Sequence, residues 1–124
     1  MEQLIPVFEL VGRILYGGFF VVGGMMHFMK LKDMTAYAQM KGAPMPQLST
    51  IVTGIVIVLA GLGVIFDVYA TISLLLIATF LVVITPIMHA FWKVDDPNMK
   101  MVDMQMFLKN MALLGAALFL LALA

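Results

Sequence analysis

Four polar side chains stand inside otherwise apolar stretches of this chain: His27, His89, Lys109 and Asn110. An ionised residue at the centre of a membrane helix costs about 2.5–3.5 kcal/mol on insertion scales, so such groups need a reason to be there. Neutral imidazoles can ligate haem iron, hydrogen-bond a quinone carbonyl or carry protons, and an ammonium attracts a quinol anion or an acidic headgroup. The spacing places the four groups at one membrane depth on three helices, which predicts a cofactor-binding cluster. These ligand-binding and proton-carrying roles stay open, with bis-histidine haem the less favoured one, and satisfied interfacial histidines are the structural alternative.

The first apolar stretch also carries an ion-pair pattern. Glu9 and Arg13 are four residues apart, in the order that favours a pair on one helix face. An interfacial ion pair is one interpretation, and a contact of Arg13 with an anion or a cofactor headgroup is the other. Arg13 and His27 fall on one helical stripe at opposite ends of the span. Trp92 follows His89 at a helix end, as is typical of aromatic residues in the membrane interface.

The composition indicates which solvent this chain is built for. Hydrophobic residues make up 64% and charged residues 11% of the 124 residues, and the mean hydropathy is +1.11. A soluble domain has about 45–50% apolar and about 25% charged residues, so lipid is the solvent that fits. The net charge of zero gives no indication of a nucleic-acid partner. Because there are no cysteines, a redox role must use a bound cofactor or a partner subunit.

Four stretches are long enough to span a membrane, which takes about 20 apolar residues in a helix. They are Leu10–Met29, Leu48–Phe66, Val68–Phe91 and Met104–Ala124. Asp67 is the only charge between Lys41 and Lys93, which predicts a tight hairpin between the second and third spans. We therefore predict an all-α protein, an integral membrane four-helix bundle that forms a single domain over residues 1–124.

The connections carry helix start and stop signals. Within Lys30–Gln47, Asp33 can cap a short helix, Gly42 fits the left-handed position after it, and two prolines then prevent continuation. We expect this helix to be amphipathic and to lie in the interface between the first and second spans. Asp96 followed by Pro97 predicts that the last helix begins before it enters the membrane.

The lysines predict the orientation of the bundle. The connections after the first and third spans carry Lys30, Lys32, Lys41, Lys93 and Lys100, and the other side offers Arg13 alone. The positive-inside rule then places the lysine-rich loops in the cytoplasm and both termini outside, in a plasma or bacterial inner membrane.

Small residues predict how the helices pack, because lipid supplies no hydrophobic drive between them. The expected seams use Gly17, Gly18, Gly23, Gly24, Gly54, Gly61 and Gly63.

Several ordered pieces of sequence carry a family resemblance over nearly the whole chain. They are Gly12-Arg13, Gly24–Phe28, Lys41–Pro46, His89–Trp92 and Phe107–Gly115. In this order and spacing the chain resembles the DoxX family of small four-helix membrane proteins. The resemblance implies association with quinol oxidase, thiosulfate:quinone oxidoreductase or membrane thiol-homeostasis systems. The matching positions imply the candidate site Arg13, His27, Lys41, His89, Trp92, Lys109 and Asn110. Ile57 stands where many relatives have a glutamate, and Met26 where asparagine is frequent, which weakens the case for proton-coupled chemistry.

These observations favour a quinone-associated subunit or accessory of a membrane redox system, whose electrons come from a partner redox subunit. The first alternative is a non-enzymatic assembly or anchoring subunit, in which the polar groups join helices. A small-molecule transporter ranks third, because four short helices would need a homo-oligomer to enclose a pathway. The lipid bilayer is the immediate partner in each case, and no metal site is predicted.

Overall fold

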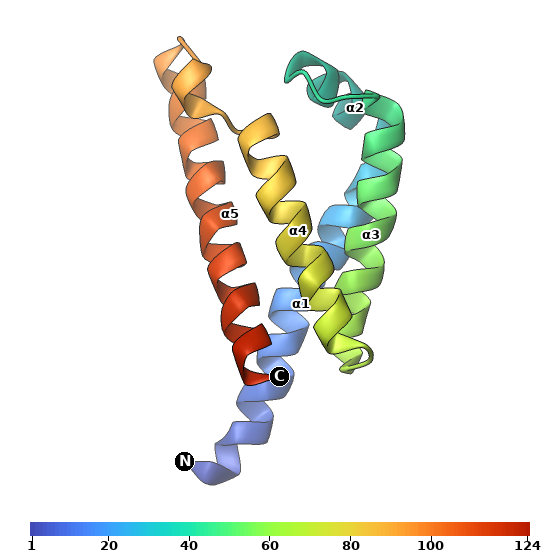
Figure 1. Ribbon diagram of the computed structural model, residues 1–124, viewed down its shortest axis with the longest axis vertical. Helices are drawn as coiled ribbons and strands as arrows, with labels where there is room; N and C mark the ends of the chain where they lie inside the picture. The colour runs from blue at the N-terminus through green and yellow to red at the C-terminus, as the bar shows by residue number, and fades with distance from the viewer.

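The structure, a computed structural model that describes all 124 residues, is entirely helical (Figure 1). Its elements are η1 (Glu2–Leu4), α1 (Ile5–Met29), α2 (Leu31–Met40), α3 (Pro46–Phe66), α4 (Ala70–Met88), η2 (Phe91–Lys93) and α5 (Pro97–Leu123). The predicted all-α bundle with a short helix between the first two spans is confirmed. The third span is shorter as a helix than predicted, since α4 ends at Met88 and residues 91–93 form a separate 3₁₀ turn.

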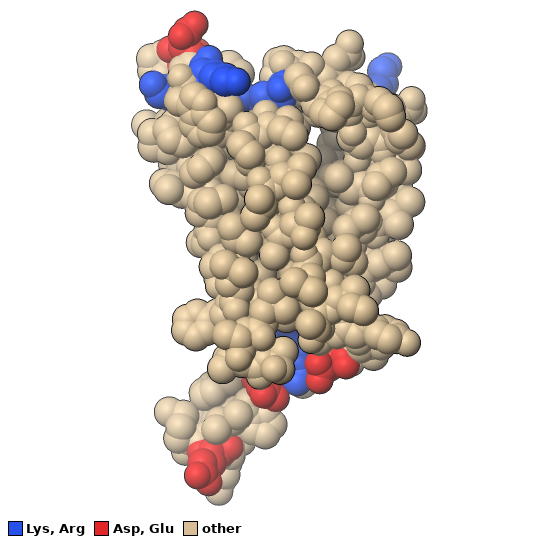
Figure 2. Space-filling view, viewed as in Figure 1, with Lys and Arg blue, Asp and Glu red and all other residues tan.

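Four helical segments are long and apolar enough to cross a membrane. They cover Glu2–Met29, Pro46–Phe66, Ala70–Lys93 and Pro97–Leu123. Figure 2 shows most of the lysines and arginines at one end of the molecule together with some acidic residues, further acidic residues and another basic one near the other end, and an uncharged surface between them. Large apolar side chains such as Leu15, Val22, Phe119 and Leu123 are exposed on this surface. A soluble protein would bury them, so the bundle is a multi-pass membrane protein.

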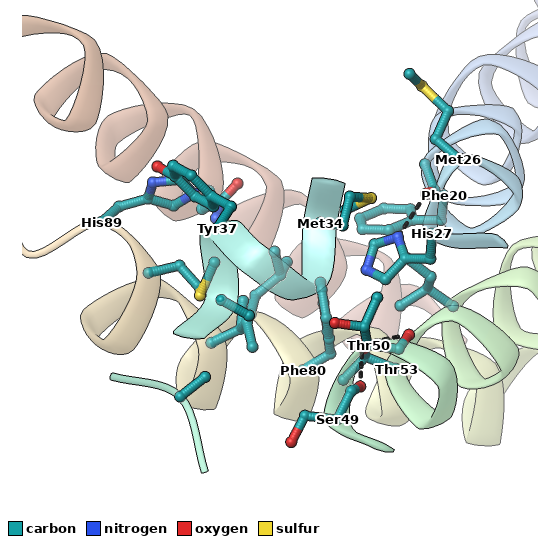
Figure 3. Close-up of a pocket in the computed structure, with 18 of the residues that line it drawn as sticks. Phe20, Met26, His27, Met34, Tyr37, Ser49, Thr50, Thr53, Phe80 and His89 are labelled. Atoms are coloured by element: carbon teal, nitrogen blue, oxygen red, sulfur yellow. Dashed lines mark hydrogen bonds between the residues drawn. The ribbon is translucent and has the colours of Figure 1, made fainter. Parts of the chain in front are cut away.

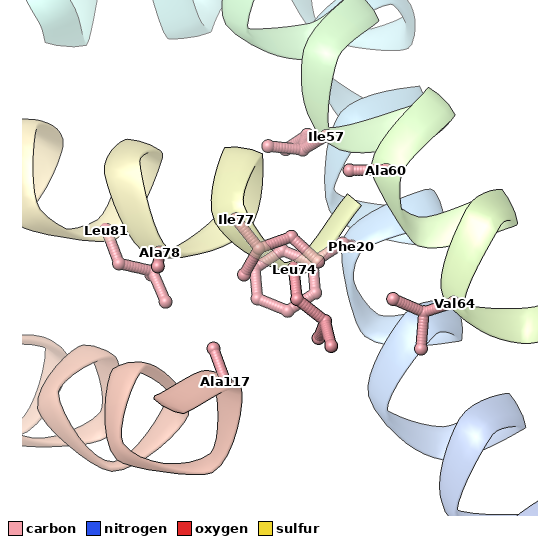
Figure 4. Packing of buried hydrophobic residues seen from close by; sticks show 9 residues of the cluster. All are labelled: Phe20, Ile57, Ala60, Val64, Leu74, Ile77, Ala78, Leu81 and Ala117. Atoms are coloured by element: carbon pink, nitrogen blue, oxygen red, sulfur yellow. The ribbon is translucent and has the colours of Figure 1, made fainter. Parts of the chain in front are cut away.

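Two pairs of helices build the bundle and diverge toward the end that carries α2. α1 packs along α3, and α5 packs along α4. The α3–α4 hairpin holds the pairs together at one end, and they separate toward the lysine-rich end, where α2 lies beside α3 (Figure 1). Nine buried apolar side chains fill the region where the pairs meet, with Phe20 among the α4 residues Leu74 and Ile77 (Figure 4). In lipid this packing stabilises the bundle through close van der Waals contact.

Close backbone contact between α1 and α3 depends on facing glycines. A Cβ atom on Gly17 would lie 2.5 Å from the carbonyl oxygen of Gly61, and one on Gly24 would lie 2.8 Å from that of Gly54. These four glycines confirm the predicted seam. The prediction was wrong for Gly18 and Gly23, where a Cβ would meet nothing within 4 Å because both face away from α3.

The connections follow most of the predicted signals. Gly42 has φ 81° after α2, and the Asp96 side chain caps α5 by accepting a hydrogen bond from the Asn98 amide at 3.4 Å. Asp33 is not the predicted cap, because α2 already begins at Leu31, after Lys30, and leaves Asp33 in its first turn. The hairpin turns at Asp67, whose φ is 55°.

Candidate functional site

A cavity of about 660 Å³ opens between the diverging helix pairs, with α2 along one side. Its inner wall is apolar and includes Phe20, Ile57, Phe80 and Leu81, which continue from the packed core. Polar side chains from α1, α2, α3 and α5, and from His89 directly after α4, occupy the part nearer the lysine-rich end. A hollow is visible on the surface below α2, between α3 and α4 (Figure 2). The cavity is therefore amphipathic, with an apolar body and a polar end that faces the lysine-rich end of the bundle.

All four residues of the predicted cluster line this cavity: His27, His89, Lys109 and Asn110. His27 comes from α1, Lys109 and Asn110 come from α5, and His89 directly follows the last residue of α4. They do not form one contact cluster. Figure 3 shows His27 on one side of the cavity, near Thr50 and Thr53, and His89 on the other side, beside Tyr37. The cavity therefore has two separate sets of polar side chains, one around His27 and one around His89, on opposite sides.

His27 is held by the backbone of its own helix. Its Nδ1 lies 2.7 Å from the carbonyl oxygen of Gly23, one turn earlier. A carbonyl oxygen only accepts hydrogen bonds, so Nδ1 carries the proton in the neutral ring. Nε2 then presents a lone pair and has no hydrogen-bond partner in the protein. His27 is thus positioned as a hydrogen-bond acceptor at the cavity.

His89 is held by a buried carboxylate that the sequence reasoning missed. Asp103 is 3% exposed. Its carboxylate lies 3.2 Å from His89 Nδ1, accepts a hydrogen bond from the Tyr37 hydroxyl at 3.4 Å, and pairs with the Lys41 ammonium. Burial raises the pKa of Tyr37, which keeps its hydroxyl protonated as a donor. Asp103 therefore joins α2, the segment after α2, and the end of α4 to α5.

A regular spacing in α5 could have revealed Asp103. The three buried residues of this helix are Asp103, Asn110 and Ala117, which are seven residues apart and so share one face. Polar residues on the buried face of a membrane helix require partners on a neighbouring helix. The predicted last span began at Met104 and so left Asp103 outside it.

Lys109 and Asn110 have different surroundings although they are adjacent. The Asn110 amide nitrogen donates to the Thr85 hydroxyl at 3.1 Å, a buried bond that joins α5 to α4. The Lys109 ammonium lies 3.6 Å from the Met106 sulfur and 5.2 Å from the centre of the Phe19 ring. No carboxylate pairs with Lys109, so it offers a cation to the cavity without an anion of its own.

The other three candidates lie outside the cavity. Lys41 acts through its ion pair with Asp103. Trp92 is 52% exposed and packs edge-on against Phe91 and Phe107. Arg13 forms the expected pair with Glu9, with 3.3 Å between Nη2 and Oε2, and belongs to the opposite end of α1 from His27. The structure therefore separates Arg13 and Trp92 from the cavity residues.

Three hydroxyls on α3 complete the polar lining. Thr50 donates to the Pro46 carbonyl and Thr53 to the Ser49 carbonyl, both at 2.7 Å, and Ser49 donates to the Pro44 carbonyl. Each hydrogen is thus used within the backbone of α3 or its start, which leaves oxygen lone pairs available at the cavity.

Comparison with known proteins gives one match. The family model described as DoxX matches residues 8–90, which is more than half of the chain. The chain therefore belongs to the DoxX family. The match includes Arg13, His27, Lys41 and His89 but stops before α5, so the resemblance of Phe107–Gly115 lies outside it. No curated protein and no solved structure matches the chain.

Proposed function

We propose that this DoxX-family membrane protein binds the head group of a lipid-soluble quinone in the cavity between its helix pairs, as a quinone-associated subunit of a membrane redox system. The amphipathic cavity is the observation that carries the proposal. A quinone has a flat polar head and an apolar tail, and both parts have a counterpart here. The aromatic residues Phe19, Phe20 and Phe80 line the space beside the polar groups.

Hydrogen-bonding groups support this ligand more than a purely apolar one. Lys109 brings an ammonium donor to the cavity, and an oxygen of the head group can accept from it. His27 presents the lone pair of its Nε2 on the opposite helix pair, where it can accept a hydrogen bond from a hydroxyl of the reduced head group. An apolar ligand would leave these groups without partners, which is unfavourable away from water.

The electrons must be exchanged with another molecule. The chain has no cysteine, so it offers no thiol–disulfide couple of its own. A bound quinone supplies two-electron redox chemistry when present, and the residues of this chain bind and orient it. A partner subunit then delivers or removes the electrons.

Two cavity variants test the proposal. In purified protein reconstituted in lipid nanodiscs, Lys109→Ala should reduce binding of a short-tailed benzoquinone by about 3–10-fold, the effect of one hydrogen bond to a charged group. His27→Ala should reduce binding of the corresponding quinol by a similar factor, because Nε2 can accept a hydrogen bond only from the hydroxyl of the reduced form. Lys32→Ala is the charge-matched control, because Lys32 is exposed and does not line the cavity. Unchanged quinone binding in Lys109→Ala together with unchanged quinol binding in His27→Ala would contradict the proposal.

An assembly or anchoring role is the second candidate. The start of α1 projects beyond the rest of the bundle (Figure 1), and residues 1–12 are all exposed. A partner protein could cover this segment. Purification from native membranes with a stoichiometric protein partner, and without bound quinone, would favour this role over the first.

A further inference from the structure

The cavity offers mainly hydrogen-bond acceptors, and this bias bears on which redox form of a ligand it selects. The Nδ1 atoms of both histidines face oxygen atoms of the protein, the Gly23 carbonyl for His27 and the Asp103 carboxylate for His89. In each neutral ring the proton therefore lies on Nδ1, and Nε2 keeps its lone pair. Neither Nε2 has a partner in the protein.

The α3 hydroxyls add to the same bias. Thr50, Thr53 and Ser49 each donate their hydrogen to a backbone carbonyl, so what they can offer a ligand is an oxygen lone pair. Asn110 uses an amide hydrogen on Thr85. Lys109 and Lys30 are the cationic donors of the lining.

The two oxidation states of a quinone differ in what they need from such a site. The carbonyl oxygens of a quinone only accept hydrogen bonds, whereas the hydroxyls of a quinol can donate as well as accept. Facing an acceptor, a carbonyl gains nothing and suffers lone-pair repulsion, while a hydroxyl forms a bond. Either form can still accept from Lys109.

We infer that the cavity selects the quinol over the quinone, with Nε2 of His27 and Nε2 of His89 accepting hydrogen bonds from quinol hydroxyls. The two histidines lie on opposite sides of the cavity (Figure 3), and a quinol has hydroxyls on opposite sides of its ring. The α3 hydroxyl oxygens are further acceptors next to His27. This inference rests on the proposed function and names the form of the ligand that the same site prefers.

The test compares both forms of one ligand in the intact protein. A benzoquinone with a short alkyl tail, and its quinol kept under anaerobic conditions, are titrated into nanodisc-reconstituted protein by calorimetry. We expect the quinol to bind about tenfold more tightly, from two hydrogen bonds of ordinary strength. A tenfold preference raises the midpoint potential of the bound two-electron couple by about 30 mV relative to the couple free in the same lipid.

Variants locate the preference in the named residues. His27→Phe and His89→Phe keep a flat ring but remove the acceptor, so each should weaken quinol binding about 3–10-fold and leave quinone binding nearly unchanged. Thr53→Val removes an acceptor with little change of shape and should act in the same direction, in case a histidine variant fails to fold. Tyr16→Phe is the control, since the Tyr16 hydroxyl bonds the Leu113 carbonyl at 2.6 Å and does not line the cavity.

The outcomes separate this inference from the proposal beneath it. Binding of neither form would overturn the proposed function. Binding of both forms with equal affinity, or tighter binding of the quinone, would overturn the inference and leave the proposed function standing. A quinol preference that stays undiminished in His27→Phe, His89→Phe and Thr53→Val alike would overturn the assignment to these acceptors.

Discussion

Replacement of Asp103 by alanine should be among the most destabilising single substitutions in this protein. The carboxylate is 3% exposed and serves Tyr37, Lys41 and His89 at once. The side chain of Lys41 is itself only 13% exposed, so it cannot recover full hydration when the carboxylate is removed. Removal of one member of a buried ion pair costs about 3–5 kcal/mol, because the other charge stays buried without a partner.

The free energy of unfolding can be measured by titration with sodium dodecyl sulfate in mixed micelles, followed by helical circular dichroism. Asp95→Ala is the matched control, because Asp95 is exposed in the connection before α5 and no hydrogen bond or ion pair involves its side chain. We expect the control to lie within about 0.5 kcal/mol of the wild type. A loss for Asp103→Ala of less than about 1 kcal/mol, the value typical of an exposed pair, would refute the argument from burial.

A double variant checks that the loss arises from the stranded ammonium. Lys41→Met combined with Asp103→Leu removes both charges and fills the space with apolar groups. Buried pairs replaced in this way are often as stable as the original. The double variant should therefore recover most of the stability that Asp103→Ala loses. If it is as unstable as Asp103→Ala, the bonds to Tyr37 and His89 contribute more than the ion pair.

Three further predictions concern the bundle itself. Gly61→Ala should destabilise it by about 1–3 kcal/mol through overpacking against α1, whereas Gly18→Ala, which meets open space, should not, as the same titration would reveal. Thr85→Val should cost about 1–3 kcal/mol in that assay, because it leaves the buried amide of the α5 asparagine without its acceptor. Single cysteines at Asp95 and at Asp67 should react with a membrane-impermeant thiol reagent from opposite sides of the membrane, with Asp95 on the cytoplasmic side; labelling of both from one side would contradict the four-span topology.

The sequence was sufficient for the elements because their signals are local. Long apolar runs, the glycine after α2 and the Asp96-Pro97 start each depend on a few neighbouring residues, and all three appear as predicted. Helix ends were less exact, as Asp33 illustrates. A capping residue and a residue in the first turn differ by a shift of a few residues, and the packing of α2 beside α3 decides between them.

The partners of polar groups depend on contacts between distant parts of the chain. Lys41 and Asp103 are 62 residues apart, and Thr85 and Asn110 are 25 apart. The sequence predicted that His27 and His89 lie at one membrane depth, but a depth does not specify which side of the cavity each ring occupies. The rotation of each helix determines that, and rotation follows from side-chain packing that no local pattern specifies.

The two histidines depend on different groups for the same tautomer, and this allows their contributions to be separated. Nδ1 of His27 donates its proton to the backbone carbonyl of Gly23, and no side-chain substitution removes that acceptor. Nδ1 of His89 donates its proton to the Asp103 carboxylate. In Asp103→Asn the facing group carries an amide that can donate to Nδ1, so Nε2 of His89 can carry the proton and become a donor.

The quinol preference of this variant should then fall to about the part that His27 supplies. The midpoint potential of the bound couple should lie between the value of the free couple and the value in the wild type. Because asparagine matches aspartate in size, the unfolding titration can confirm that the variant is folded. An unchanged potential in folded Asp103→Asn would mean that Nε2 of His89 does not touch the ligand, and His27 alone would then account for the preference.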